Sequence, residues 1–263
     1  MNVNNVLTSK GGIGKSLVAG ILAGYFRDRG QRTLTVDLDP NQPTLTRYQA
    51  LEVQRIDVTR NGKVDSGLFD QALEKIYGSG LHDGSPRSDL DQVVIDSGAG
   101  SYLPFVEYMR REDVMEDFAE LGYLHTLHVV LAGGQALEDC VQSLAQLAAH
   151  FGQGSRIVVW LNDFFDALPW DTAEAFLGSQ LYRHHKALIH GVVQMPDLDP
   201  ETEGRAFTRF SKANQTFSEA LASGSMTYRD SKRLRRIRAT YYDQLDPIFA
   251  ELDTNALAAE AES

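Results

Sequence analysis

The segment Lys10–Ser16, with the sequence KGGIGKS, constrains the fold of this chain more than any other feature. It lies between a short apolar segment, Val3–Thr8, and a segment whose apolar residues recur at helical spacing. Glycines let the backbone curl and aim its N–H groups at an anion, and a helix start adds its dipole to that field. A glycine turn that merely joins a strand to a helix is the plainer interpretation. The lysine and the hydroxyl at these spacings favour a phosphate-binding loop.

Two side chains at the end of this loop indicate the kind of ligand. Lys15 can reach the β and γ phosphates of a nucleoside triphosphate, and the Ser16 hydroxyl is placed to coordinate Mg²⁺. We therefore expect the nucleotide to lie on one continuous stretch of the chain: Lys10, Gly11, Gly12, Ile13, Gly14, Lys15, Ser16 and Leu17.

Apolar segments that alternate with helical patterns predict an α/β fold. Helices are expected after the glycine loop, over 69–77 and over 137–151, and strands over 3–8, 32–36, 55–58, 92–95, 126–131, 156–161 and 188–193. Continuously apolar strands separated by helices are typical of a mostly parallel sheet covered by helices on both faces. We expect a single P-loop NTPase domain over 1–253, with a loop over 78–89, and a short acidic tail over 254–263.

Polar side chains follow several of these strands, at the sheet edge where parallel sheets bind ligands. Asp37 and Asp39 follow the second strand, Asp96 follows the fourth, and Asn162 and Pro196 follow the last two. Carboxylates beside a phosphate loop are typical Mg²⁺ ligands, often through water. An acidic strand end that only caps a turn is the alternative interpretation of the first pair.

The loop departs from the standard P-loop pattern at one position. Ser9 stands where that pattern requires glycine, and Lys10 precedes the two glycines. In this KGGxGK[ST] form the chain resembles the ParA and MinD ATPases, which carry a deviant phosphate loop. The resemblance implies that ATP is the nucleotide and that Lys10 is a signature lysine, which contacts the phosphates, commonly across a homodimer interface. A second positive charge there would compensate charge that develops during γ-phosphoryl transfer.

The same resemblance implies roles for the polar strand ends. Asp39 would orient or activate the attacking water, Asp37 would lie near the Mg²⁺ shell, and Asp96 would bind Mg²⁺, usually through water. The implied catalytic residues are Lys10, Lys15 and Asp39, and the implied metal site comprises Ser16, Asp37, Asp39 and Asp96.

Two further positions concern the base and the second switch. The resemblance implies that Asn162 hydrogen-bonds adenine and that Pro196 borders the base, whereas a turn-forming asparagine is the alternative for Asn162. After Asp96 the ParA pattern continues with a pair of prolines, but this chain has the more flexible SGAG over 97–100.

Several other stretches resemble a narrower group, the TraL-type ATPases of conjugative plasmids. They run from the first strand to about residue 250 and include LVAGILAGYFRDRG, DSGAGS, AGGQALEDC, VVWLNDFF and TFSEAL. This resemblance implies an action in conjugal DNA transfer, alongside relatives that act in plasmid stability.

A basic segment near the C-terminus stands out in a chain whose net charge is −11. Apolar residues within and after it keep helical spacing, and Pro247 is expected to kink or stop the helix. The six cations suit a DNA phosphate backbone, but a solvated helix face with some arginines paired to acidic neighbours is the alternative. They are Arg229, Lys232, Arg233, Arg235, Arg236 and Arg238.

Composition limits the remaining options. A protein this acidic does not coat nucleic acid indiscriminately, so DNA contact would need a local patch. The single cysteine, Cys140, allows no disulfide within the chain and no thiolate metal cage, and it is expected in the core. Trp160 is also expected in the core, and the three histidines His184, His185 and His190 lack metal-ligand spacing. The sequence shows no transmembrane segment, signal peptide or membrane-binding helix, which favours the cytoplasm.

Three functions are compatible with these features. The first is a Mg²⁺-dependent ATPase that works as a nucleotide-switched dimer in conjugal DNA transfer or plasmid maintenance, with slow hydrolysis stimulated by a partner protein. The second is a partition ATPase that binds nonspecific DNA through the basic segment. The third is a biosynthetic P-loop ligase that uses ATP to form amides, which requires a substrate pocket.

Overall fold

The computed structural model describes residues 1–78, 89–164 and 166–261, and places seven strands in one parallel sheet. The sheet order is β3-β2-β6-β1-β7-β8-β9, with β1 and its phosphate loop in the centre. The strands are β1 (Asn2–Val6), β2 (Thr33–Asp37), β3 (Gln54–Arg55), β6 (Gln92–Asp96), β7 (Leu124–Ala132), β8 (Ser155–Asn162) and β9 (Ile189–Gln194). The predicted α/β class with a parallel sheet is confirmed.

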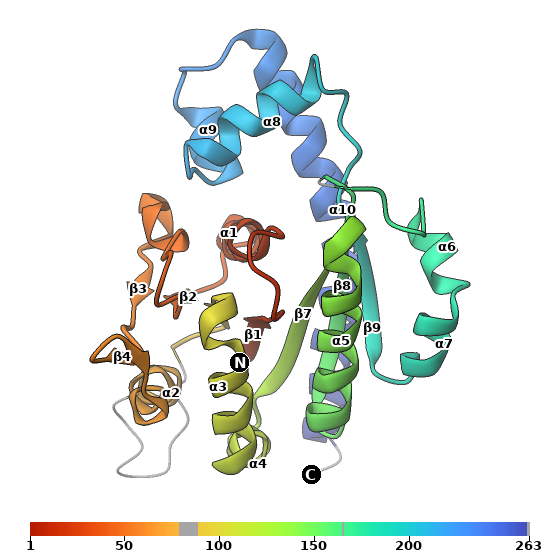
Figure 1. Ribbon diagram of the computed structural model, residues 1–263. Coiled ribbons are helices and arrows are strands. Elements are labelled where there is room, and N and C mark those ends of the chain that lie inside the picture. The colour runs from red at the N-terminus through yellow and green to blue at the C-terminus, as the bar shows by residue number, and fades with distance from the viewer. Residues whose placement is uncertain (79–88, 165, 262–263) are drawn as a thin grey trace.

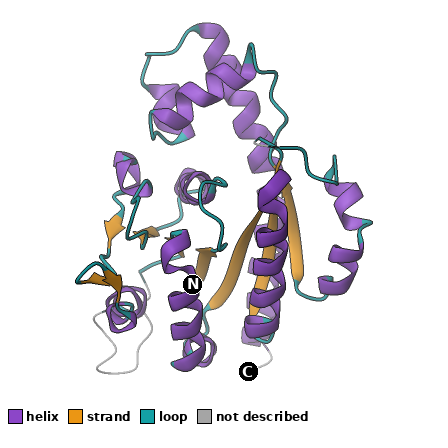
Figure 2. Ribbon diagram, viewed as in Figure 1, coloured by secondary structure: helices purple, strands orange, loops and turns teal. Residues whose placement is uncertain are grey.

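Helices form the other layers of the molecule (Figures 1 and 2). They are α1 (Lys15–Asp28), α2 (Asp70–Tyr77), α3 (Ala99–Arg111), α4 (Val114–Glu120), α5 (Leu137–Phe151), α6 (Ala173–Leu177), α7 (Gln180–His185), α8 (Glu203–Lys212), α9 (Phe217–Ala222) and α10 (Tyr228–Ala261). Short 3₁₀ turns lie at 45–47, 49–51, 66–68 and 134–136, and β4 (Thr59–Arg60) pairs antiparallel with β5 (Lys63–Val64).

Neighbouring residues of β1 show which helices cover which face. Side chains alternate across a strand, so Asn4 and Asn5 face opposite layers. Asn5 contacts Met109 of α3, whereas Asn4 bonds His128, whose ring lies against Phe249 of α10. Helix α1 packs beside α10 on that second face, with a ring contact between Phe26 and Phe249 at 4.8 Å. The sheet is therefore covered by helices on both faces, as predicted.

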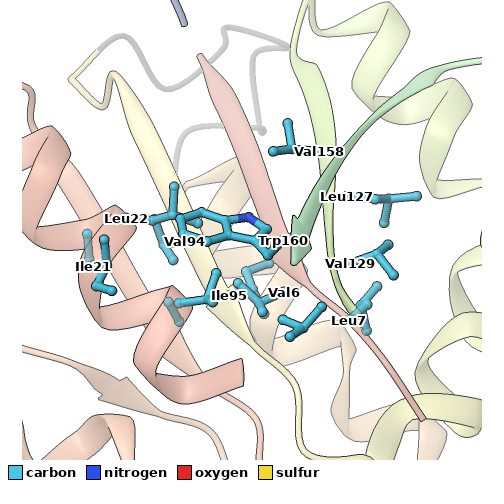
Figure 3. Packing of buried hydrophobic residues seen from close by; sticks show 14 of the residues in the cluster. Val6, Leu7, Ile21, Leu22, Val94, Ile95, Leu127, Val129, Val158 and Trp160 are labelled. Atoms are coloured by element: carbon cyan, nitrogen blue, oxygen red, sulfur yellow. The ribbon is translucent and has the colours of Figure 1, made fainter. Parts of the chain in front are cut away.

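The core lies on the central strands. Trp160 of β8 is fully buried, and its ring lies 6.1 Å from that of His128 of β7 and 6.3 Å from that of Tyr241 of α10. Figure 3 shows Trp160 together with other residues of the buried core. Cys140 is likewise buried on the inner face of α5, and burial raises the pKa of its thiol. The expectation that both residues belong to the core is confirmed.

The structure corrects two sequence predictions. Residues 55–58 do not form one strand, because an Asx turn at Asp57, which accepts from Thr59 N at 2.9 Å, separates β3 from β4. Pro247 is expected to kink or stop its helix, and it does not stop it, since α10 continues through Pro247 to Ala261. Burial of Leu245, Ile248 and Phe249 around the proline offsets the lost backbone hydrogen bond.

Two further observations concern the remaining predictions. The loop predicted over 78–89 lies almost wholly outside the described residues. In the part of the chain that is described, no helix is both long enough and apolar enough to span a bilayer.

Candidate nucleotide site

The loop between β1 and α1 has the backbone that the glycines predict. Gly12 and Gly14 adopt φ values of 74° and 95°, a region that side-chain-bearing residues rarely adopt. Gly14 is the N-cap of α1, and its carbonyl accepts the first helical bond from Val18 N at 3.0 Å. The helix therefore begins at the loop, so its free N–H groups and positive dipole end lie where an anion bound by the loop would be stabilised.

Lys15 lies inside this loop. Its side chain is buried, and Nζ donates to the Lys10 carbonyl at 2.5 Å. Burial lowers the pKa of Lys15, while the carboxylates of Asp96 and Asp39 act in the opposite direction. The ammonium and both predicted carboxylates thus come together at one end of the sheet.

Asp96 is a buried carboxylate beside the Ser16 hydroxyl. Both of its oxygens are inaccessible to solvent, and among the described residues neither is held by a hydrogen bond of ordinary geometry. Burial raises the pKa of Asp96 to about 7, against the nearby Ser16 hydroxyl and Lys15 ammonium, which lower it. A buried carboxylate beside a hydroxyl is a donor set that fits Mg²⁺, so the residues present suit the predicted metal.

The two carboxylates at the end of β2 accept hydrogen bonds from backbone N–H groups. Asp37 is buried and accepts from Asp39 N at 2.9 Å and from Thr46 N at 3.2 Å, while burial raises its pKa. Asp39 accepts from Asn41 N at 2.8 Å and from Gln42 N at 3.0 Å. Both residues therefore cap turns, and whether they also take part in Mg²⁺ binding and water activation stays a prediction.

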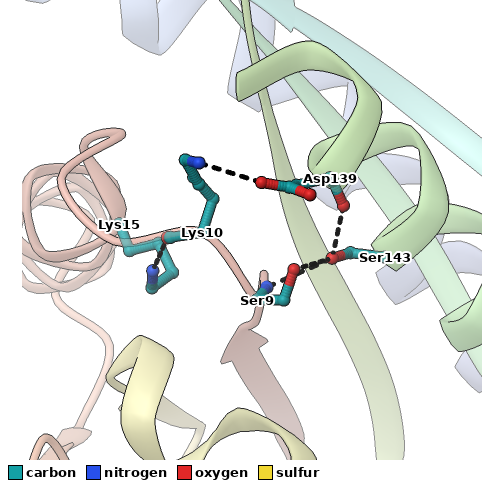
Figure 4. A network of polar contacts seen from close by, with 5 residues as sticks. All are labelled: Ser9, Lys10, Lys15, Asp139 and Ser143. Carbon is teal, nitrogen blue, oxygen red and sulfur yellow. Dashed lines mark hydrogen bonds and ion pairs between the residues drawn. The ribbon is translucent and has the colours of Figure 1, made fainter. Parts of the chain in front are cut away.

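Lys10 points away from Lys15 and toward α5 (Figure 4). Its Nζ lies 2.9 Å from Asp139 Oδ2, and this hydrogen bond and charge raise the pKa of Lys10. Ser9 N donates to Ser143 Oγ at 3.1 Å, and Ser143 Oγ donates to the Asp139 carbonyl at 2.8 Å. The predicted signature lysine thus pairs with its own chain.

Asn162 anchors the loop to the end of β8. Its Nδ2 donates to the Ile13 carbonyl at 2.9 Å, and its Oδ1 accepts from Phe164 N at 3.1 Å. The second bond shows that Asn162 forms a turn after β8. Pro196 follows β9 and is half-buried, and Met195 N, just before it, donates to the Leu161 carbonyl at 2.9 Å. Contact of Asn162 and Pro196 with adenine stays a prediction.

The basic segment forms the start of α10, with Leu234, Ile237, Tyr241 and Leu245 buried as the spacing predicts. Its cations fall into two groups. Arg233 pairs with Asp230 and Arg236 with Glu203, each at 2.9 Å, and Arg238 lies over the Tyr242 ring. The other three, which we call the exposed cations, form no ion pair within the described residues: Arg229, Lys232 and Arg235.

Asp139 and Ser143 are functional candidates that sequence reasoning missed. Asp139 belongs to the stretch AGGQALEDC, which carries part of the TraL resemblance, so one signal was present. Nothing in the local pattern connects it to Lys10, which is 129 residues away in the chain.

A parallel sheet whose central strand leads through a glycine loop into a helix, with a lysine and a buried aspartate at the loop, defines a P-loop nucleotide-binding protein. Residues 6–215 match the family model described as the CobQ/CobB/MinD/ParA nucleotide binding domain, and the chain belongs to this family. Two Escherichia coli proteins named Protein TraL are 36% and 33% identical to it over 244 residues, covering 93% of this chain and 97% of theirs.

Solved structures agree with the family at the level of the fold. The MinC:MinD cell division protein complex of Aquifex aeolicus matches with a TM-score of 0.52 and 13% identity, covering 91% of this chain and 94% of that chain. MinD from the same organism matches with a TM-score of 0.50 and 16% identity, covering 91% and 95%. At these identities the likeness concerns the fold alone.

Proposed function

We propose that this protein binds and slowly hydrolyses ATP with Mg²⁺, and that ATP joins two copies of the chain. The observation that carries the proposal is the meeting of Lys15, Ser16 and the buried Asp96 at a loop that opens a helix. Bound Mg²⁺ would neutralise negative charge on the phosphate oxygens. The chain's own residues then have distinct tasks: the loop amides and Lys15 hold the phosphates, and Asp39 orients the attacking water.

The cellular role that we propose is conjugal DNA transfer or plasmid maintenance. Identity of 33–36% to proteins named TraL, over nearly their whole length, supports it. The sequence motifs resemble those of TraL-type ATPases of conjugative plasmids, and this resemblance links the name TraL to conjugal transfer. A partner protein that stimulates hydrolysis belongs to the same proposal.

The proposal is tested by calorimetry of Mg²⁺·ATP binding to wild type and Lys15→Ala. Charge-assisted bonds to the phosphates are strong, so we expect the affinity to fall by about 100-fold. Lys186→Ala, at the exposed end of α7, is the matched control and keeps the wild-type affinity. Equal affinity of wild type and Lys15→Ala would contradict the proposal.

DNA binding is a second candidate function, and the exposed cations favour it. Residues 203–250 hold nine Lys and Arg against five Asp and Glu, in a chain of net charge −11. Opposite charges are thereby segregated, which is the arrangement that a local phosphate contact needs in an acidic protein.

Salt-dependent binding to duplex DNA of mixed sequence tests this second function. Each neutralised phosphate contributes about 0.9 to the slope of log K against log salt concentration. Replacing the exposed cations by alanine should weaken binding and reduce that slope by about 2 to 3. A control variant with the same net charge carries alanine at Arg55, Lys63 and Lys186. If the two variants bind DNA equally, the basic surface of α10 is not the contact.

A further inference from the structure

Gly98 is the second residue after Asp96, in the segment where the ParA pattern has a pair of prolines. It is the N-cap of α3, with φ −63° and ψ 157°, and it is buried. Any residue can adopt this conformation, so the backbone does not require glycine here. The reason for a glycine at position 98 must be space rather than flexibility.

The space is taken by Asp39. A Cβ atom on residue 98 would lie 2.5 Å from each carboxylate oxygen of Asp39 and closer still to its Cγ atom. The pattern repeats two residues later, where a Cβ on Gly100 would lie 2.6 Å from Asn41 Nδ2. Two glycines after β6 therefore receive two side chains from the loop after β2.

The sheet holds these two loops side by side. Strands β2 and β6 are parallel neighbours in which Asp37 pairs with Asp96, and Leu38 N continues the pairing by donating to the Asp96 carbonyl at 2.8 Å. Two residues after Asp37, the Asp39 side chain lies against Gly98. Its Oδ1 accepts hydrogen bonds from the Asn41 and Gln42 backbone N–H groups. The carboxylate is fixed between its own loop and the start of α3.

We infer that Gly98 is a positioning residue for ATP hydrolysis, because its lack of a side chain leaves the space in which the Asp39 carboxylate is held. The inference rests on the proposed function, in which Asp39 orients the attacking water. A methyl group at position 98 meets the end of a flexible side chain rather than backbone, so the carboxylate moves and the fold stays intact. A displacement of about 1 Å at a catalytic group can cost about 100-fold in rate.

The test compares Gly98→Ala with Gly178→Ala. Gly178 has an ordinary φ of −79°, and a Cβ there would lie no closer than 3.4 Å to other atoms. We expect Gly98→Ala to bind Mg²⁺·ATP within threefold of wild type by calorimetry, but to turn over about 100-fold more slowly. Gly178→Ala should match wild type in both measurements. A Gly98→Ala variant with the wild-type turnover rate would overturn the inference.

Two further measurements separate positioning from a general structural effect. In an Asp39→Ala background, Gly98→Ala should cause no further loss of turnover, since no carboxylate remains to be displaced. In protein without nucleotide, Gly98→Ala should speed hydrogen exchange of the Asn41 and Gln42 backbone amides, because in wild type both donate hydrogen bonds to Asp39 Oδ1. A further loss of turnover in the double variant, or an unchanged exchange rate, would contradict the inference that Gly98 holds Asp39 in position. If wild type hydrolyses no ATP, the proposed function fails, and the exchange experiment alone tests whether Gly98 positions Asp39.

Discussion

At the scale of single residues, the pair of Lys10 and Asp139 answers a question that the loop sequence poses. Two lysines in one short loop repel each other unless one of them meets additional negative charge. The sequence suggests the γ-phosphate held by a facing subunit as that charge, whereas in the single chain Asp139 of α5 supplies it at 2.9 Å. For Lys10 to contact a nucleotide across a dimer interface, it must first leave Asp139.

We predict that Asp139→Ala dimerises at a lower ATP concentration than wild type. Both partners of the ion pair are partly exposed, so its loss should leave the thermal stability nearly unchanged. Glu138→Ala is the matched control, because it removes an exposed acidic residue from the same helical turn. Light scattering during an ATP titration measures the midpoint. A midpoint for Asp139→Ala at or above that of wild type would contradict the prediction.

Residues whose role depends on local pattern could be predicted from the sequence. Lys15, Ser16 and Asp96 lie where the loop and the strand ends place them, because sequence-local rules govern a strand, a glycine turn and a helix start. Asp139 could not be predicted, since its link to Lys10 comes from the packing of α5 beside the loop. The close approach of Asp39 to Gly98 could not be predicted, because the sequence shows a glycine but not the side chain that lies against it.

At the scale of elements, the sheet carries buried polar side chains on both faces. On one face Trp160 Nε1 donates to His128 Nδ1 at 3.0 Å, and His128 Nε2 bonds Asn4 Oδ1 at 3.2 Å. On the other face His125 bonds Asn5 at 2.8 Å and Ser155 at 2.6 Å. Burial lowers the pKa of His125 and of His128 to about 3, so both rings are neutral in the folded protein at pH 7.

These histidines should make the protein sensitive to acid. Their pKa falls from 6.5 to about 3 on folding, so between these values the unfolded chain binds protons that the folded chain does not. The free energy of unfolding therefore rises with pH across this window, by about 1.4 kcal/mol per pH unit for each histidine. Asp96, whose pKa is raised to about 7, acts in the opposite direction between pH 3.8 and 7.

We predict that His128→Gln reduces the slope of unfolding free energy against pH by about 1.4 kcal/mol per pH unit near pH 5. Urea denaturation at several pH values measures this slope. His150→Gln, on the exposed end of α5, should keep the wild-type slope. The same slope for His128→Gln and wild type would show that His128 does not resist protonation in the fold.

The strands could be predicted more fully than the helices. Buried parallel strands read as continuous apolar segments, and β1, β6, β7 and β8 lie where such segments predict them. Helix α3 was missed because it begins in SGAG and contains Pro104, which both argue against a helix locally. Helix α10 does not stop at Pro247, because tertiary packing outweighs the local cost of a proline.

At the scale of the whole molecule, the residues to which we assign phosphate binding, metal binding and water orientation lie at one edge of the sheet. The phosphate loop, Asp39 and Asp96 lie at the carboxyl ends of three neighbouring strands, β1, β2 and β6 respectively. Lys10 lies at the same edge and is partly exposed, so a second chain could approach it there. The family and fold could be predicted from the loop, whereas the cluster of α8, α9 and the start of α10 beyond the sheet could not, because its shape depends on long-range packing (Figure 1).

The nucleotide-switched dimer is the central claim, and its mass in solution tests it most directly. Sedimentation velocity with Mg²⁺ and saturating ATP should show wild type at twice the chain mass of 29.2 kDa, and at the chain mass with ADP. Lys10→Ala should bind ATP yet stay at 29.2 kDa, because it lacks the charge proposed to reach the facing nucleotide. A wild type that stays at the chain mass in saturating ATP, or a Lys10→Ala variant that dimerises equally well, would contradict the account.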